Sequence, residues 1–163
     1  MKKLFAVLVP LVLSASAHAI VIPWSASLDG AQEVPSNPSP ATGSGFGTYD
    51  TVTNLLNWDI TWDGLVAPAF AAHFHLAPPG VNGGVIVGIP GVAGLTSGNV
   101  VAMAALTDGA QEDGFLAGNF YINIHTAPFP GGEIRGQVNV PEPSALALLG
   151  LGLAGLGWAR RKS

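Results

Sequence analysis

The stretch that decides the fold is Leu56 to Trp62, which reads LNWDITW. Apolar and polar side chains alternate along it without a break, and the apolar set is Leu56, Trp58, Ile60 and Trp62. A period of two places alternate side chains on opposite faces of an extended chain. The stretch is therefore predicted to be a β-strand with one buried face. The segment Gly45–Asp50 precedes it across the turn Thr51–Asn54, and the two segments are predicted to pair as a hairpin.

Short segments with frequent glycine and proline continue on both sides of this hairpin. The further predicted strands are Ser25–Leu28, Ala71–Leu76, Gly84–Val87, Phe120–His125 and Glu133–Val138. The predicted loops are Gln32–Pro40, Ala77–Gly83 and Thr126–Gly132, and Gln111–Ala117 is predicted to be a short helical turn. The apolar segment Val100–Leu106 fits no single pattern. Because no long segment has a helical period, the domain is predicted to be all-β, as an antiparallel sandwich or barrel.

The first residues have the three parts of a secretory signal peptide. Met1–Lys3 is a short basic start, an apolar run follows, and Ala17–Ala19 fits a cleavage site of small residues. Residues 1–19 are therefore predicted to be removed on export. An uncleaved N-terminal anchor is the alternative, although the apolar run is shorter than a typical membrane span.

The last residues also fall into three consecutive segments of different composition. Pro141, Glu142 and Pro143 precede an uncharged apolar run from Ala145 to Ala159, and Arg160, Arg161 and Lys162 follow. This run is short for a helix that needs about 20 apolar residues to cross a bilayer, but snorkelling of the terminal arginines extends its reach. The basic end is expected to stay in the cytoplasm.

This order of motif, apolar run and basic cluster resembles the PEP-CTERM sorting signal of Gram-negative bacteria. The resemblance covers residues 140–163 and implies a transmembrane helix there. It also implies recognition and cleavage near Pro141–Pro143 by a membrane transpeptidase of the exosortase type. The alternative is a plain C-terminal membrane anchor without processing. Both interpretations place the preceding domain outside the cytoplasm.

Residues 20–139 form one predicted domain, whose length suits a single core. They include nine acidic residues and one basic residue, which gives a formal charge of −8 with neutral histidine. Such a domain is not expected to bind nucleic acid, because it has too few cations to neutralise phosphates. It is expected to attract cations or basic partners. The chain has no cysteine, so a core or a metal ion must hold the domain in place of disulfides.

Three histidines are the candidate metal ligands. His73 and His75 lie two residues apart and share one face of their predicted strand, and His125 lies on the polar face of another. If the strands are neighbours, three imidazoles converge, which is a normal ligand set for zinc or copper. The alternative is that His73 and His125 hydrogen-bond to the backbone or to each other and so hold two strands together. The sequence leaves both interpretations open.

Asn123, Glu133 and Arg135 are predicted to form a structural polar cluster near these histidines. Arg135 is the only arginine or lysine between Lys3 and Arg160. A half-buried arginine needs a carboxylate or carbonyl groups. Glu133 can supply one on the same strand face, and the other candidate carboxylates are Glu33, Asp59 and Asp63. An anion-binding or catalytic role for Arg135 is the alternative.

The sequence contains no recognisable catalytic or phosphate-binding motif. Serines and threonines are scattered, and none stands with a base at a spacing that indicates a nucleophile. The glycine-rich segment Gly80–Gly88 has neither a lysine nor a helical pattern after it, so it is interpreted as turns. No catalytic residues are predicted, and the chain is expected not to be an enzyme.

Three blocks of the domain together resemble the CHRD domain, which is named after the animal protein chordin and is widespread in bacterial secreted proteins. The blocks contain the Gln32–Pro35 motif, the His73–His75 segment and Tyr121–Gln137, and the resemblance runs from Ser27 to Val138. It implies an all-β sandwich of the Greek-key, immunoglobulin-like or superoxide-dismutase-like kind, with no enzymatic activity firmly attached. The growth-factor partners of chordin do not carry over to a bacterial surface protein, so the extracellular partner stays open.

The expected function is that of an exported, non-catalytic protein. It passes through an inner-membrane intermediate and is sorted to the cell surface or extracellular matrix, including biofilm. The alternative is an envelope protein that binds copper or zinc through His73, His75 and His125; otherwise no cofactor is expected. A third hypothesis is a module that binds a basic protein or a polysaccharide through Trp58, Trp62 and Tyr121; it is disfavoured for the two tryptophans, because parity places them in the core.

Overall fold

The computed structural model describes residues 20–141. The strands are β1 (Val21–Asp29), β2 (Thr42–Asp50), β3 (Leu55–Asp63), β4 (Ala69–Leu76), β5 (Gly84–Gly88), β6 (Gly98–Ala105), β7 (Phe120–Thr126) and β8 (Phe129–Gln137). The helices are the 3-10 turn η1 (Gly30–Gln32) and α1 (Gly109–Leu116). The predicted signal peptide and the sorting-signal residues Glu142, Pro143, Arg160 and Arg161 lie outside the described residues. Within residues 20–141, no helix has the length and apolar composition needed to cross a membrane.

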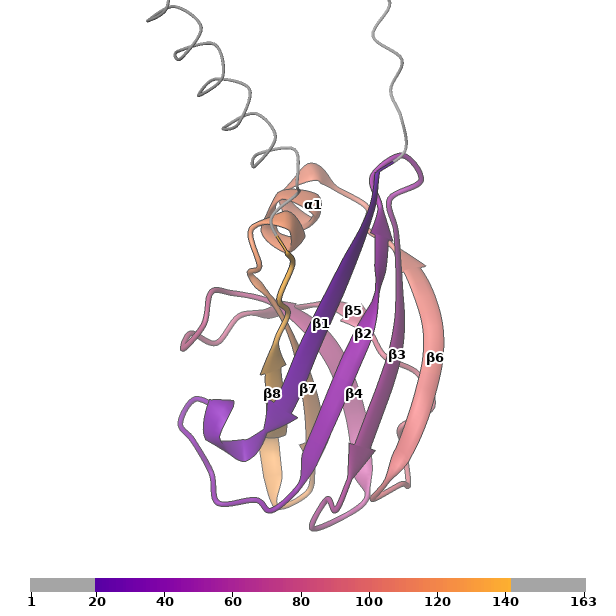
Figure 1. The fold of residues 1–163 in the computed structure, drawn as a ribbon. Coiled ribbons are helices and arrows are strands. Elements are labelled where there is room, and N and C mark those ends of the chain that lie inside the picture. Colours follow the sequence, from indigo (N-terminus) through magenta and orange to yellow (C-terminus); the bar gives the residue numbers. More distant parts are fainter. Residues whose placement is uncertain (1–19, 142–163) are drawn as a thin grey trace, which may run out of the picture.

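All eight strands of residues 20–141 belong to one antiparallel sheet with the order β5-β4-β7-β8-β1-β2-β3-β6. The sheet curls, so that β1, β2, β3 and β6 form one half and the remaining strands face them from behind (Figure 1). The halves join where β1 meets β8, through the register pair Asp29 and Arg135 and a bridge between Ser25 and Asn139. The all-β antiparallel prediction is confirmed, and the two facing layers are halves of one nearly closed sheet.

The core fills the space between these two halves. On β3, the four apolar residues of the alternating stretch are all buried, as the period of two predicts. The ring of Phe74 on β4 packs against Trp58 of β3, with centroids 5.2 Å apart, and against Trp24 of β1 at 5.8 Å. These contacts join strands that are not neighbours in the sheet. Burial of such large rings stabilises the packing of one half on the other.

Most predicted elements are present, with different bounds. β2 and β3 pair along their whole length, as the hairpin prediction requires. β1 begins at Val21 rather than Ser25, and the ambiguous segment Val100–Leu106 lies largely in the outer strand β6. Residues Gln111–Ala117, predicted to be a helical turn, lie mostly within α1.

The predicted loop Thr126–Gly132 is wrong. A two-residue turn, Ala127–Pro128, joins β7 to β8, which already begins at Phe129. Proline and paired glycines in this stretch indicate a loop in the sequence. In the structure an irregular strand accommodates them, because the register of β7 and β8 shifts between Ile124 and Thr126.

Candidate metal centre

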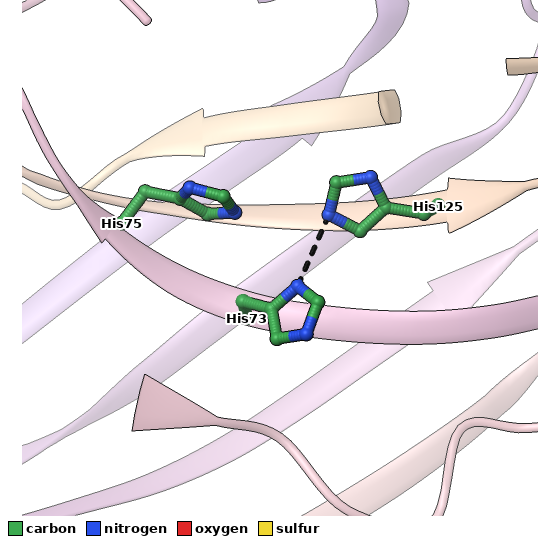
Figure 2. A group of neighbouring side chains, drawn as sticks. All are labelled: His73, His75 and His125. Atoms are coloured by element: carbon green, nitrogen blue, oxygen red, sulfur yellow. Dashed lines mark hydrogen bonds between the residues drawn. The ribbon is translucent and has the colours of Figure 1, made fainter. Parts of the chain in front are cut away.

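Three histidines meet on the face of the sheet that points away from the aromatic core. His73 and His75 lie on β4 and His125 lies on the neighbouring strand β7. One ring nitrogen from each histidine lies within 4.8 Å of the other two. Figure 2 shows the three rings turned toward one shared space between the strands. The structure therefore brings together the three residues that strand parity indicates as metal ligands.

Two backbone carbonyls determine the tautomers of His75 and His125. The Nδ1 atom of His75 lies 3.0 Å from the carbonyl oxygen of Gly83, and the Nδ1 atom of His125 lies 3.1 Å from that of Pro130. A carbonyl oxygen only accepts, so each neutral ring carries its proton on Nδ1 and its lone pair on Nε2. Histidines that bind a metal commonly donate their other N–H in this way, which fixes the ring orientation.

The nitrogens that face the shared space can be satisfied in two ways. Nδ1 of His73 lies 3.2 Å from Nε2 of His125 (dashed line in Figure 2). A hydrogen bond donated by His73 explains this distance. So does a shared metal ion, because two nitrogens that bind tetrahedral zinc at about 2.0–2.1 Å are roughly 3.3 Å apart. The two accounts differ at His75, whose buried Nε2 has no hydrogen-bond partner among residues 20–141.

Burial keeps the three imidazoles neutral. It lowers the pKa of His125 to about 4, and the neighbouring His73 and His75 lower that pKa further, while the hydrogen bond to Pro130 opposes them. Burial also lowers the pKa of His73. Burial lowers the pKa of His75 too, against the hydrogen bond to Gly83, and the charges of His73 and Arg135 lower it further. A neutral imidazole is the form that binds a metal, so the cluster can take up an ion near neutral pH without first losing protons.

Tyr121 and Arg135 form the wall of the cluster on the side of β8. The ring of Tyr121 stacks on His75, with 4.9 Å between centroids and an interplanar angle of 11°. The guanidinium carbon of Arg135 lies 3.5 Å from the centre of the Tyr121 ring. Arg135 is buried and donates to the side-chain oxygens of Asn82 and Gln137, each at 3.3 Å. This wall packs against one face of the His75 ring.

Glu133 and Arg135 do not pair, and the predicted polar cluster is divided between two places. Within residues 20–141, no hydrogen bond or ion pair joins these two side chains. The carboxylate of Glu133 instead accepts from the hydroxyl groups of Thr126 at 2.6 Å and Ser39 at 2.7 Å. Glu133 therefore ties the end of β7 to the segment before β2, away from the histidines.

The irregular start of β8 explains this separation. Gly132 precedes Glu133 and has a φ of +141°, a conformation that favours glycine. Together with the register shift in the β7–β8 pairing, it turns the side chain of Glu133 toward the end of the sheet. Arg135 lies in the regular part of the pairing, opposite Asn123. Sequence parity assumes an unbroken strand and therefore fails at this position.

Glu33 is the carboxylate that interacts with Arg135 electrostatically, and the sequence names it only among several candidates. It is buried, and its Oε2 accepts from Nδ2 of Asn123 at 3.4 Å. Burial raises the pKa of Glu33 to about 7, against the opposing charge of Arg135. Glu33 belongs to the Gln32–Pro35 motif, and that motif is the signal in the sequence that could have singled it out.

A groove of about 500 Å³ borders the cluster at His73. It lies between β4 and β6, near the seam where the sheet does not close, and its lining includes Phe70, His73, Pro90 and Met103. His73 is the most exposed of the three histidines. An ion or a small molecule would therefore reach the cluster on the His73 side.

Two protein-family profiles match the chain, one over the folded domain and one over the C-terminal residues. The family profile of the CHRD domain matches residues 24–138, and that of the PEP-CTERM protein-sorting motif matches residues 139–162. Searches of the curated proteins and of the solved structures each gave no match. The sorting motif identifies a protein that is exported in a Gram-negative cell, is processed by the membrane enzyme exosortase, and ends at the cell surface or outside the cell. The chain therefore belongs to the CHRD-domain family and carries a PEP-CTERM signal for exosortase sorting.

Proposed function

We propose that this exported CHRD domain binds one copper or zinc ion through His73, His75 and His125. The ligand atoms are Nδ1 of His73 and Nε2 of the other two histidines. Three neutral imidazoles suit both metals. The formal charge of −8 on residues 20–139 attracts a cation to the domain. The sorting motif accordingly accounts for the export of the domain, and the histidine centre accounts for its proposed binding activity.

The observation that carries the proposal is the unpartnered Nε2 of His75. Leaving a buried lone pair without a partner is costly, at about 1–3 kcal/mol. A hydrogen bond between His73 and His125 satisfies those two rings but does nothing for His75. A metal ion in the shared space satisfies all three rings at once. The hydrogen-bonded arrangement is then the metal-free form of the same site.

We propose further that the role is non-catalytic, at the cell surface or in the extracellular matrix, including biofilm. The sorting motif supports the location. The absence of a catalytic motif from the sequence supports a binding or structural role. Fractionation of the producing cells tests the location: the processed protein is expected in the surface and matrix fractions. Recovery of the processed protein from the cytoplasm would contradict it.

The direct test is the metal content of the exported protein, purified without a histidine tag. Inductively coupled plasma mass spectrometry is expected to find about one copper or zinc ion per chain after reconstitution. The variant His73→Ala/His75→Ala is expected to lose it. The conservative His75→Gln variant guards against misfolding, and circular dichroism checks each variant. Asp113→Asn removes an exposed acidic charge on α1 and is expected to keep the metal. Equal metal in all variants would mean that the ion binds elsewhere.

A further inference from the structure

Two buried oxygens beside the histidine cluster have no hydrogen-bond donor among residues 20–141. They are Oε1 of Glu33 and Oδ1 of Asn123. Both belong to side chains that already share one contact, because Nδ2 of Asn123 donates to Oε2 of Glu33 at 3.4 Å. Two buried lone pairs without a donor form an unfavourable arrangement.

The geometry places these two oxygens side by side. Nδ2 of Asn123 also donates to the carbonyl oxygen of Gly131 at 3.2 Å, and this second contact sets which end of the amide is the nitrogen. A Cβ atom added to Gly132 would overlap both Oε1 of Glu33 and Oδ1 of Asn123. The space left by the missing side chain of Gly132 therefore holds both unpartnered oxygens.

A carboxylic acid and a primary amide complement each other through two hydrogen bonds. The amide N–H donates to one carboxyl oxygen, and the acid O–H donates to the amide oxygen. An ionised carboxylate only accepts, so it cannot complete the second bond. The contact from Nδ2 of Asn123 to Oε2 of Glu33 matches the first of these bonds. The second bond needs a proton on Oε1 of Glu33, which would donate to the unpartnered Oδ1 of Asn123.

We propose that Glu33 is a protonated acid paired with Asn123 in the metal-free protein, and that it releases this proton when a cation occupies the histidine cluster. The proposal rests on the proposed metal site. Burial, which raises the pKa of Glu33 to about 7, is consistent with it. The carboxylate left behind becomes the counter-charge of a site whose three ligands are neutral.

Asn123 links Glu33 to the strands that carry the metal ligands. Asn123 is the register partner of His73 across the β4–β7 pairing, and it lies on the same face of β7 as His125. A divalent ion held by the histidines adds positive charge next to Asn123, in surroundings where charges are weakly screened. This charge favours the ionised form of Glu33 over the acid.

The other titratable groups near Glu33 do not replace it as the proton source. Arg135 of β8 is a permanent cation that favours the carboxylate, and Glu133 is occupied with Thr126 and Ser39 at the end of the sheet. Asp29 at the end of β1 accepts from the backbone N–H of Gln32. The other groups are His73 and His75 on β4 and His125 on β7, and because burial lowers the pKa of each, they hold fewer protons than free imidazoles do at the same pH.

The sign of the pH dependence follows from this assignment. Below a pH of about 7, metal binding must displace the proton of Glu33, so affinity rises with pH, by up to about tenfold per unit. Above the pKa of Glu33 the proton is already gone and this dependence ends. The Glu33→Gln variant keeps a donor for the amide oxygen of Asn123 but has no proton to release.

Calorimetric titration with Zn²⁺, in buffers of different ionisation enthalpy, counts the protons released. The exported protein is expected to release about one proton per zinc ion at pH 6 and close to none at pH 8.5. Glu33→Gln is expected to bind zinc and release close to none at either pH. Asp113→Asn, which removes an exposed acid far from the site in sequence, is expected to behave as the parent does. Equal proton release from Glu33→Gln and the parent at pH 6 would overturn the proposal.

Infrared spectroscopy of the metal-free protein tests the acid–amide pair without any metal. A difference spectrum of the parent against Glu33→Gln is expected to show a protonated carboxyl band at pH 6 that disappears by pH 8.5. Its absence at pH 6 would overturn the proposal. If zinc and copper fail to bind in every variant while the band is present, the metal site and the proton release both fail and only the acid–amide pair stands.

Discussion

Arg135 is a buried cation whose hydrogen-bond acceptors are neutral oxygens and whose flat face lies on an aromatic ring. Its guanidinium carbon is 3.5 Å from the centre of the Tyr121 ring, and Tyr121 in turn stacks on His75. A guanidinium group is planar and weakly hydrated, so it tolerates such a site, whereas the compact ammonium of lysine is strongly hydrated. The shape of the charged group therefore matters here more than the charge itself.

Replacing Arg135 tests this argument at the level of the residue. Arg135→Lys is expected to lower the free energy of unfolding by about 2 kcal/mol, because the ammonium loses the ring contact and its acceptors. Arg135→Met retains an apolar stem on Tyr121 and is expected to lose less. Urea unfolding measures both variants at neutral pH. A lysine variant as stable as the parent, or more stable than the methionine variant, would contradict the argument.

At the level of the strands, most of what the sequence predicts about the site comes from the alternation of side chains between the two faces of a strand. His73 and His75 share a face because they lie two apart, and the buried Phe74 between them lies in the core. That β4 and β7 are neighbours is a long-range pairing, and no local pattern in either strand encodes it. Parity therefore proposes the histidine cluster, and only the observed pairing brings the rings together.

The parts that parity misses lie where the chain is irregular. Glu33 sits in a segment between η1 and β2 that has no period, so its burial could not be read from a pattern. The polar face of β7 is also buried, although its sequence alternates like a half-exposed strand. Loop segments contact that face: Glu33 accepts from Nδ2 of Asn123, and the backbone N–H of Gly83 donates to the hydroxyl group of Tyr121 at 3.0 Å. Periodicity describes strands and says little about the segments that fold over them.

Helix α1 shows how a short element is held at the end of the sheet. The side chain of Asp108 accepts from the backbone N–H of Gln111 at 2.9 Å and so caps the first turn. Phe115 is buried and packs against Tyr49 and Phe120, with ring centroids 5.1 and 5.5 Å apart. The cap fixes where the helix begins, and the aromatic contacts fix how it lies on the sheet.

Removing the cap tests how much the Asp108 hydrogen bond contributes to the stability of the helix. Asp108→Ala is expected to lower the stability of the protein by about 1 kcal/mol, because one backbone donor of the first turn loses its acceptor. Asp108→Asn keeps an acceptor, and its stability is expected to differ from that of the parent by no more than roughly 0.3 kcal/mol. Thermal unfolding compares the two variants. Equal losses for alanine and asparagine would show that the charge of Asp108, and not its hydrogen bond, stabilises the helix.

For the whole molecule, the end of the fold and the start of the sorting motif coincide. Asn139 donates to the carbonyl oxygen of Ser25 at 2.7 Å and accepts from its N–H at 3.1 Å, which closes the sheet between β1 and the chain beyond β8. The PEP-CTERM match begins at this same residue. The sorting residues therefore follow the folded domain directly, and changes in them are expected to leave the histidine cluster intact.

Sorting can accordingly be separated from folding by substitution. Glu142→Ala is expected to block processing and leave a precursor of higher mass in the membrane fraction, because the motif is the part that exosortase recognises. Replacing Arg160, Arg161 and Lys162 by serine is expected to disturb retention of the basic end in the cytoplasm, which depends on positive charge.

Glu112→Ala removes an acid within the domain and serves as the control, with normal processing expected. Fractionation followed by mass spectrometry of the intact chain reads out each case. Normal processing of Glu142→Ala would show that the apolar run and basic end suffice for recognition, while loss of metal binding in that variant would show that the domain and its signal are not independent.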